Sequence, residues 1–213
     1  MSITHVKSFT HGPLATNTYV CYNNTEAVIV DASCSNDQEE SEIAEYIQSK
    51  HLTVRHLLLT HAHVDHILGC TALSKRFNLL WQAHPDTSIW LEGAPARAPF
   101  YGFHMEPVPK PGKWLHERDT ITFGNAKWRI LHTPGHAPGS ICFVDDISQF
   151  VIAGDVIFQR SIGRTDLPGG DMGMLMESIF QQLLMLPDEM TIYAGHGPPT
   201  KIGLERVNNP FLQ

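Results

Sequence analysis

Four short apolar runs in this chain each lead into residue types that bind metal ions. The runs are "VRHLLLT" (54–60), "KWRILH" (127–132), "FVIAG" (150–154) and "TIYAG" (191–195), and they are followed by "HAHVDH" (61–66), His136, Asp155 and His196. Their length and their β-branched and aromatic residues predict strands. Sites in α/β proteins are usually assembled on loops that follow strands. We therefore expect a fold that brings these four strand ends together.

The remaining periodicities predict an α/β layered fold. Further strands are expected at 17–22, 27–31, 120–123 and 140–144, and helices at 37–50, 66–76, 84–92 and 171–186. In the helix 37–50, Ile43, Ala44 and Ile47 form the expected buried stripe, and Ser35 with Gln38 resembles a capping box. The segment 92–112 is rich in Pro and Gly, so it is expected to be a long loop.

Composition excludes several classes of protein. The 213 residues include 42% hydrophobic and 17% charged residues, which is typical of a globular chain with a sizeable core, and one domain over 1–213 is expected. A formal charge of −7 gives no electrostatic basis for nucleic-acid binding. With neither a signal-like N-terminus nor a long apolar run, we expect a cytoplasmic protein without a membrane segment. The four cysteines are widely spaced, as reduced thiols would be.

The candidate ligands are too many for one metal ion. They comprise five histidines and two aspartates, and a catalytic zinc takes about three protein ligands. Two divalent metal ions are implied, and only a carboxylate has two oxygens that can bridge them, which favours Asp155 as the bridge. Zinc is the expected metal, and iron or manganese would accept the same ligands. The set is His61, His63, Asp65, His66, His136, Asp155 and His196.

Taken together, "THAHVDH", His136, Asp155 and His196 resemble the signature of the metallo-β-lactamase superfamily. The likeness runs from "GPLATNTYV" (12–20) and "VIVDAS" (28–33) to "YAGHG" (193–197). It implies a four-layer αββα sandwich with the metals at the sheet edges. It further implies that His61, His63 and His136 hold one metal, that Asp65, His66 and His196 hold the second, and that Asp155 bridges them. Asp31 is expected to orient ligands.

The stretch "SIGRTDLPGGD" (161–171) is similar to the glyoxalase II branch, and closest to short bacterial YcbL-type proteins, which also end near "NPFL" (209–212). The implied activity is hydroxyacylglutathione hydrolase: S-D-lactoylglutathione is hydrolysed to D-lactate and glutathione. Longer members add a C-terminal helical domain that helps to bind glutathione. This chain ends soon after His196, so we expect no separate domain of that kind.

The expected chemistry is attack on a thioester carbonyl by a metal-bound hydroxide, because a cation lowers the pKa of water to about 7. Asp65 is the expected catalytic residue that holds this hydroxide, and a thiolate leaves readily without an acid. Arg164 matches a basic position of the branch, and two roles stay open for it: binding a glutathione carboxylate, or forming a surface salt bridge. The expected partner is a small-molecule glutathione thioester. The oligomeric state is left open, and a monomer is compatible with these features.

An oxidoreductase is the main alternative. Persulfide dioxygenases share this fold, the same ligand types and a "GRTD" stretch, but they use one iron held by two histidines and an aspartate. The corresponding residues here are His61, His136 and Asp155. The "LPGGD" that follows "GRTD" favours the hydrolase. A β-lactamase, a nuclease and an inactive metal-binding module fit the sequence less well.

Overall fold

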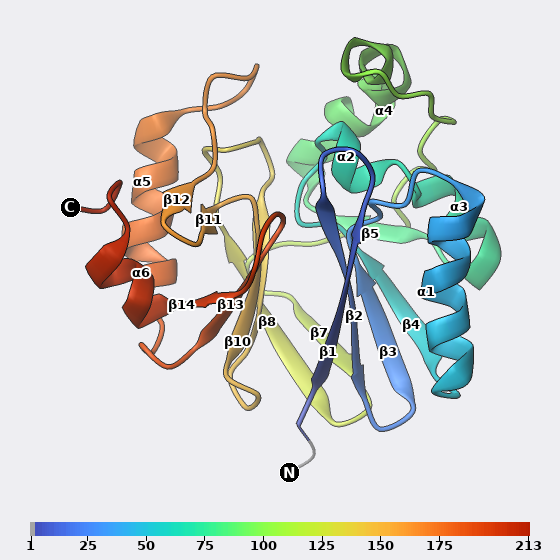
Figure 1. Cartoon of the computed structure of the whole chain (residues 1–213), viewed down its shortest axis with the longest axis horizontal. Coiled ribbons are helices and arrows are strands. Elements are labelled where there is room, and N and C mark those ends of the chain that lie inside the picture. The colour runs from blue at the N-terminus through green and yellow to red at the C-terminus, as the bar shows by residue number, and fades with distance from the viewer. Residues whose placement is uncertain (1–2) are drawn as a thin grey trace.

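The computed structural model describes residues 3–213. Two mixed β-sheets pack face to face, and helices cover the outer face of each (Figure 1). The helices α1 and α3 lie against the first sheet, and α5 and α6 lie against the second (Figure 1). The expected four-layer αββα sandwich is confirmed.

The first sheet has the order β1-β2-β3-β4-β5-β6. The first three strands are antiparallel, and β3 to β6 run parallel. Parallel neighbours need a crossover, and helices supply it between β3 and β4 and between β4 and β5. The strands are β1 (His5–His11), β2 (Thr16–Asn23), β3 (Glu26–Val30), β4 (Thr53–Leu58), β5 (Trp81–Ala83) and β6 (Lys113–Trp114).

The second sheet has the order β14-β13-β10-β9-β8-β7, and only β10 and β13 are parallel neighbours within it. A two-stranded hairpin, β11 and β12, follows β10. The strands are β7 (Thr120–Phe123), β8 (Ala126–His132), β9 (Ile141–Asp145), β10 (Phe150–Gly154), β11 (Ile157–Phe158), β12 (Ser161–Ile162), β13 (Thr191–Ala194) and β14 (Thr200–Lys201).

The helices are short. The α-helices are α1 (Asp37–Ser49), α2 (Val64–Ile67), α3 (Cys70–Phe77), α4 (Ser88–Arg97), α5 (Met172–Gln181) and α6 (Ile202–Asn208), and the 3-10 helices are η1 (Pro85–Thr87), η2 (Ala98–Tyr101) and η3 (Leu183–Met185). In α1, Ile43 and Ile47 are buried as expected, whereas Ala44 is half-buried. The predicted capping box is wrong: Asn36 caps α1, and its side chain accepts from the backbone N–H groups of Gln38 and Glu39.

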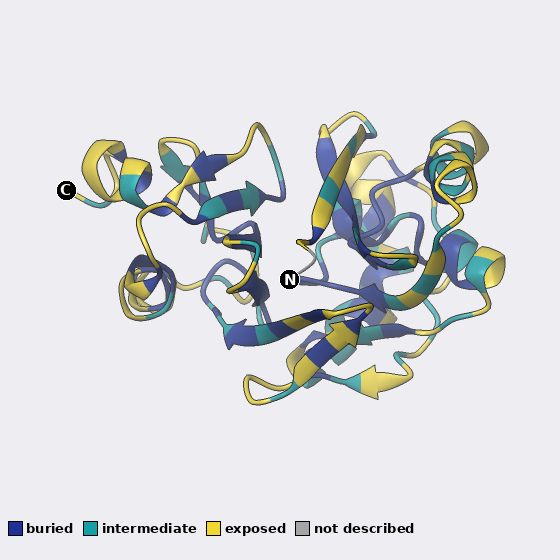
Figure 2. Ribbon diagram, turned by 90° about the horizontal axis from the view of Figure 1, so that it is seen from below, coloured by how far each residue is buried: buried dark blue, intermediate teal, exposed yellow. Residues whose placement is uncertain are grey.

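The sandwich has three apolar layers, because its central strands are buried on both faces (Figure 2). In β3, Val28 and Val30 point between the sheets and Ile29 points toward the helices. In β10, Ile152 points between the sheets and Val151 points toward the α5 side. Strands covered on both faces are continuous apolar runs, which is the pattern seen in the sequence. All four cysteines are free and buried, as expected of reduced thiols.

The segment 92–112 departs from its prediction as a loop. The helix α4 continues to Arg97 in spite of Pro95, and η2 follows directly. Pro95 has no N–H to donate to the carbonyl of Leu91, four residues earlier, so the helix continues past it with one backbone hydrogen bond fewer. The rest of the segment, from Gly102 to Gly112, is irregular, and Phe103 within it is buried.

Candidate metal centre

The seven predicted ligands meet at one end of the sandwich, between the two sheets. Four strands deliver them: His61 and His63 follow β4, His136 follows β8, Asp155 follows β10 directly, and His196 follows β13. His63 is the N-cap of α2, which puts Asp65 and His66 in the helix's first turn. The short helix turns the chain so that neighbouring residues face different parts of the site.

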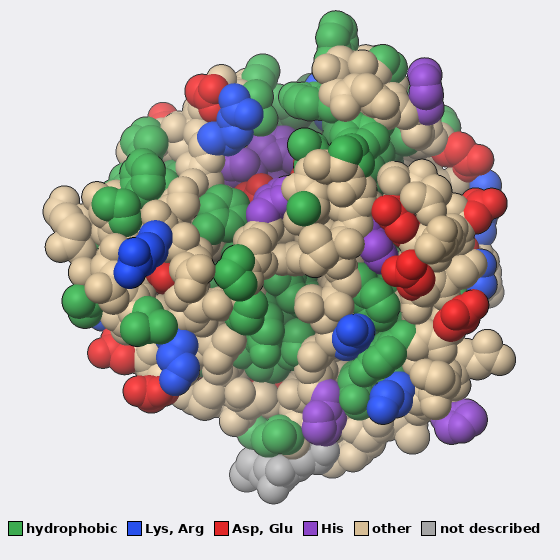
Figure 3. Space-filling model, in the orientation of Figure 1, with side chains coloured by type: hydrophobic (Ala, Val, Ile, Leu, Met, Phe, Trp, Pro, Cys, Tyr) green, Lys and Arg blue, Asp and Glu red, His purple; other side chains and the backbone are tan. Residues whose placement is uncertain are grey.

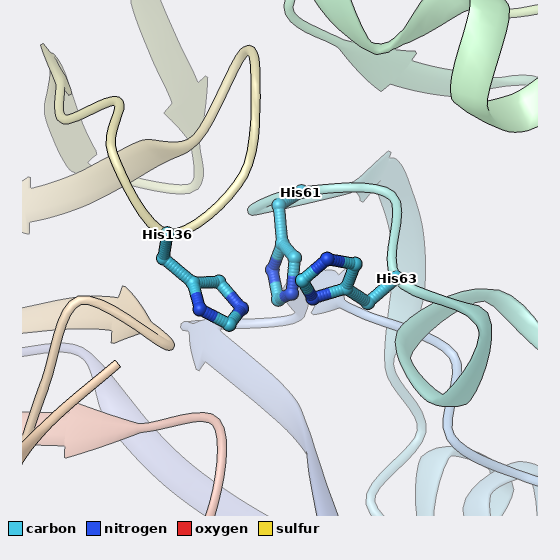
Figure 4. A group of neighbouring side chains, drawn as sticks. All are labelled: His61, His63 and His136. Carbon is cyan, nitrogen blue, oxygen red and sulfur yellow. The ribbon is translucent and has the colours of Figure 1, made fainter. Parts of the chain in front are cut away.

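Three histidines form one group. The rings of His61 and His63 come from the loop after β4, and that of His136 from the facing loop (Figure 4). One nitrogen of each lies within 4.8 Å of the others. Ring centroids are 4.8 Å apart for His61 and His63, 5.0 Å for His61 and His136, and 4.5 Å for His63 and His136. Within residues 3–213, the buried Nε2 atoms of His61 and His136 have no hydrogen-bond partner. A divalent cation would satisfy both.

Asp65, His66 and His196 form an adjoining group, again with ligand atoms within 4.8 Å of one another. Asp65 Oδ2 lies 3.5 Å from His66 Nε2 and 3.2 Å from His196 Nε2. One carboxylate and two imidazoles suit the same divalent cations as the first group.

Asp155 lies between the groups. Its Oδ1 is 3.4 Å from His66 Nε2, and its Oδ2 is 3.5 Å from His136 Nε2 and 3.4 Å from His196 Nε2. The carboxylate therefore faces nitrogens of both groups, as a bridge would. Its buried Oδ1 has no hydrogen-bond partner in the described part of the chain. The residues fit a pair of divalent cations.

The outer nitrogens of four ligands are held by hydrogen bonds. His136 Nδ1 donates to the Arg164 carbonyl at 2.8 Å, and His196 Nδ1 donates to the Leu14 carbonyl at 3.0 Å. His66 Nδ1 donates to Asp31 at 2.8 Å, and His61 Nδ1 lies 3.0 Å from Thr60 Oγ1. Each of these bonds leaves the Nε2 lone pair facing the site, which is the tautomer that binds a cation.

Asp31 connects two of these histidines, as expected. It is buried, and its carboxylate accepts from Thr60 N at 2.8 Å, from Thr60 Oγ1 at 2.7 Å and from His66 Nδ1. Thr60 Oγ1 donates to Asp31 and so accepts from His61. Thr60 was not among the residues predicted from the sequence, and neither was Thr16, whose hydroxyl donates to Asp65 at 2.7 Å. Thr60 directly precedes His61, a position that could have indicated it.

The charges are suited to cation binding at the first group. Burial, followed by the charge of His136, lowers the pKa of His63 to about 3, and burial also lowers the pKa of His61 and of His136. These imidazoles are therefore neutral at neutral pH. Burial acts to raise the pKa of Asp155, but the charge of His66 and the close approach of the His196 and His66 imidazoles outweigh it and hold the pKa well below its usual range. Neutral imidazole and ionised carboxylate are the forms that bind metal.

The second group holds protons when no cation is bound. Burial lowers the pKa of His196, but hydrogen bonds to Asp155 and Asp65 outweigh it and raise the pKa to about 10. For His66, burial is likewise outweighed by the charges of Asp155, Asp65 and Asp31, which raise the pKa well above its usual value. A cation bound here would displace these protons.

A pocket of about 500 Å³ opens over the ligands. His63, Asp65, His136, Asp155 and His196 line it, and so does the predicted substrate-binding residue Arg164. The Arg164 guanidinium forms a two-pronged ion pair with Asp166, with both distances 2.7 Å, and both side chains are exposed. Figure 3 shows His and acidic side chains in a hollow flanked by apolar ones.

Two other histidines lie together outside the pocket. The rings of His84 and His132 stack with centroids 4.3 Å apart and planes 12° apart, and Asp86 lies near them. One ligand atom of each of His84, Asp86 and His132 lies within 4.8 Å of the others, but the two rings are stacked face to face, unlike the crossed rings of the first group. Burial, followed by the charge of His132, lowers the pKa of His84 to about 4, so this is a stack with a neutral imidazole.

We expect Asp31→Asn to weaken metal binding about 10- to 100-fold, because removing a ligand's outer partner typically costs that much affinity. Asn tolerates the positive φ of 60° at this position, so the backbone is kept. Zinc affinity is measured by competition with a chromophoric chelator. Asp146→Asn, at an exposed ion pair with Arg129, is the control. Equal affinities in the two variants would remove this role from Asp31.

Among residues 3–213, no helix is both long and apolar enough to cross a membrane.

The Metallo-beta-lactamase superfamily model matches residues 11–196. The chain is 36% identical to "Probable metallo-hydrolase YqgX" of Bacillus subtilis, over 94% of each protein. It is also 36% identical to "Hydroxyacylglutathione hydrolase GloC" of Haemophilus influenzae, over 82% of this chain and 83% of that protein.

Solved structures of similar fold include proteins that carry the same superfamily name. BLEG-1 B3 metallo-beta-lactamase has a TM-score of 0.90 at 37% identity, covering 98% of this chain and 100% of that one. TTHA1623, solved in a di-iron-bound form, has a TM-score of 0.87 at 36% identity, and the match covers 97% of this chain and 100% of that one. ETHE1 from Myxococcus xanthus has a TM-score of 0.77 at 25% identity, and the match covers 97% of this chain and 83% of that one. With its sandwich fold, its histidine and aspartate groups and this match over most of its length, the chain belongs to the metallo-β-lactamase superfamily.

Proposed function

We propose that this chain is a metal-dependent thioesterase that hydrolyses S-D-lactoylglutathione to D-lactate and glutathione. The observation that carries the proposal is the pair of adjoining ligand groups joined by Asp155 at the floor of a pocket. The 36% identity to GloC, a hydroxyacylglutathione hydrolase by name, supports the substrate.

The proposed ligands are His61, His63 and His136 for one divalent cation and Asp65, His66 and His196 for the other, with Asp155 shared. Zinc is the proposed metal, and iron is supported by the di-iron form of TTHA1623. Bound at this place, the cations would acidify water to a pKa of about 7 and polarise the thioester carbonyl.

The chain's own residues position the reactants. The Asp65 carboxylate is fixed by Thr16 and faces His66 and His196 through Oδ2, and we assign Oδ1 to orient the attacking water by accepting a hydrogen bond from it. Burial acts to raise the pKa of Asp65, but the charge of His66 and hydrogen bonds from His196 and Thr16 hold it below its usual range, so the carboxylate is ionised. The thiol of glutathione has an ordinary pKa of about 8.5, so it leaves as a thiolate without being protonated by an acid.

We further propose that Arg164 binds a carboxylate of glutathione at the pocket mouth. Its pair with Asp166 is exposed to solvent, and exposed ion pairs are worth little, so a substrate carboxylate can take the place of Asp166. The guanidinium already presents the two-pronged geometry that a carboxylate requires.

The test is loss of thioester absorbance with S-D-lactoylglutathione and metal-replete protein. We expect turnover that stops on chelation and returns with zinc, iron or manganese. An absence of turnover in protein that carries two cations would overturn the proposal.

A mononuclear-iron persulfide dioxygenase is the second candidate. The similarity to ETHE1 supports it, and His61, His136 and Asp155 would hold the iron. Oxygen consumption by iron-loaded protein with glutathione persulfide separates the two reactions. The similarity to BLEG-1 adds β-lactam hydrolysis as a reaction to assay, with a chromogenic cephalosporin.

A further inference from the structure

The walls of the pocket differ in chemistry from its floor. The floor carries imidazoles and carboxylates, whereas the walls are mainly apolar and aromatic: Trp90, Phe103, Phe158, Ile162, Leu167 and Pro168. Figure 3 shows apolar side chains above and to the right of the hollow that holds the His and acidic groups, and a basic and an acidic side chain to its upper left. A metal centre that handled only small, polar acyl groups would not need so much apolar surface around the reacting carbonyl.

Two separate segments build these walls. The helix α4 and the chain after η2 contribute Trp90 and Phe103 from the side of the first sheet. The segment 162–168, which starts at the last residue of β12, contributes Ile162, Leu167 and Pro168 from the side of the second sheet. The apolar surfaces therefore face each other across the opening above the ligands.

The walls are held in place by packing. Phe103 is only 8% exposed and packs with Val64 and Ala98. The guanidinium of Arg97 lies 4.9 Å from the centroid of the Trp90 ring. Gly169 lets the loop approach this ring, since a Cβ at that residue would lie 2.9 Å from Trp90 Cζ2. A wall that is already formed binds a ligand without an ordering cost.

Cationic side chains are few in the pocket, and the one proposed to bind a glutathione carboxylate, Arg164, lies at its exposed mouth. Of the lining residues, Arg97 and Arg164 are the two with permanent positive charge. Arg97 is engaged: it donates to the Trp90 carbonyl and stacks on the Trp90 ring. Glutathione carries two carboxylates and an ammonium group, and charged groups lose free energy when they are buried against apolar surface. The apolar walls therefore match the acyl half of a glutathione thioester and not the peptide half.

We infer that the pocket is an acyl-binding site for a bulky, apolar group, and that the preferred substrate is an aromatic or branched 2-hydroxyacyl thioester. The inference rests on the proposed thioesterase function and specifies its substrate class. The acyl carbonyl lies at the ligand floor, and the substituent on its α-carbon packs between Trp90 and Phe103 on one side and Leu167 on the other.

The test compares two substrates that differ in one group. S-(R)-mandeloylglutathione carries a phenyl ring where S-D-lactoylglutathione carries a methyl group, and the two are otherwise the same. Apolar pockets typically discriminate by about 10- to 100-fold when a ligand fills or fails to fill them. We expect kcat/KM to be higher for the mandeloyl thioester by a factor in this range. A ratio of one or less overturns the inference and leaves the thioesterase intact, whereas no turnover of either substrate overturns the thioesterase.

Phe100 and Phe103 lie in the same segment and give a matched pair of variants. Phe103→Ala removes a buried part of the wall, whereas Phe100→Ala changes a side chain that is 88% exposed and does not line the pocket. We expect Phe103→Ala to lower the ratio of kcat/KM for the mandeloyl thioester over the lactoyl thioester toward one, and Phe100→Ala to keep that ratio. If Phe103→Ala does not fold, Leu167→Ala on the opposite wall replaces it.

Binding of the acid products provides a readout that does not depend on turnover. In calorimetry with metal-loaded protein, (R)-mandelate is expected to bind about tenfold or more tightly than D-lactate, and Leu167→Ala is expected to reduce that ratio. Equal affinities for the two acids would overturn the inference, whatever the substrate kinetics.

Discussion

Asp155→Ala is expected to remove both cations and to lower kcat/KM by about 10³-fold or more. The two oxygens of Asp155 lie 3.4 to 3.5 Å from nitrogens of both ligand groups, so this side chain is shared between the two cation positions. A cation contributes several kcal/mol to stabilising the developing charge, and each 1.4 kcal/mol is about tenfold in rate. Metal content by mass spectrometry and steady-state hydrolysis of S-D-lactoylglutathione measure the two effects.

His196→Ala is the matched variant. His196 belongs to the second group, and its Nε2 lies 3.2 Å from Asp65, so its loss is expected to empty mainly one position. Circular dichroism checks that both variants are folded. Equal metal loss in the two variants would contradict the assignment of Asp155 as the shared ligand.

Gly195→Ala is expected to lower kcat/KM about 100-fold although no ligand is changed. A Cβ on Gly195 would lie 2.0 Å from Asp155 Oδ1 and 2.7 Å from His66 Cε1, closer than atoms can approach. The backbone cannot easily move away, because Gly195 N donates to the Gly154 carbonyl and its own carbonyl accepts from Asn17 N, each at 2.7 Å. The carboxylate must therefore shift by more than an ångström, and misplacing a reacting group by about 1 Å can cost about 10² in rate.

Gly197→Ala is the control, two residues further on. Nothing lies within 4 Å of a Cβ at this position, but the residue has a positive φ of 73°. We expect it to lower stability by about 1–2 kcal/mol and to keep two cations. Thermal unfolding and metal content distinguish the two variants. Normal metal content and activity in Gly195→Ala would mean that the site accommodates a displaced carboxylate.

Much of the fold follows from local patterns. The apolar runs at β3, β8 and β10 and the amphipathic helix α1 are present close to where periodicity predicts them. Three short strands, β5, β6 and β14, have two or three residues each and give no periodic signal. The first strand, β1, is mostly exposed, so its sequence lacks the apolar run of a buried strand. These strands form because a neighbour supplies the hydrogen bonds.

The candidate ligands were identifiable because each follows an apolar strand at a turn. What the sequence did not indicate were the groups that orient them. The Leu14 and Arg164 carbonyls hold His196 and His136 through backbone atoms, which carry no residue signature. Thr16 reaches Asp65 across 49 positions, a contact that no local spacing predicts.

The sequence by itself determined the residue types of the site and the strand ends that carry them, because strand periodicity and metal-ligand chemistry are both local properties. The tertiary structure alone decided that Asp155 faces both groups, that Arg164 is paired with Asp166, and that Trp90, Phe103 and Leu167 enclose the opening. These arrangements depend on how two sheets and two distant loops pack, and side chains brought together by packing leave no pattern along the chain.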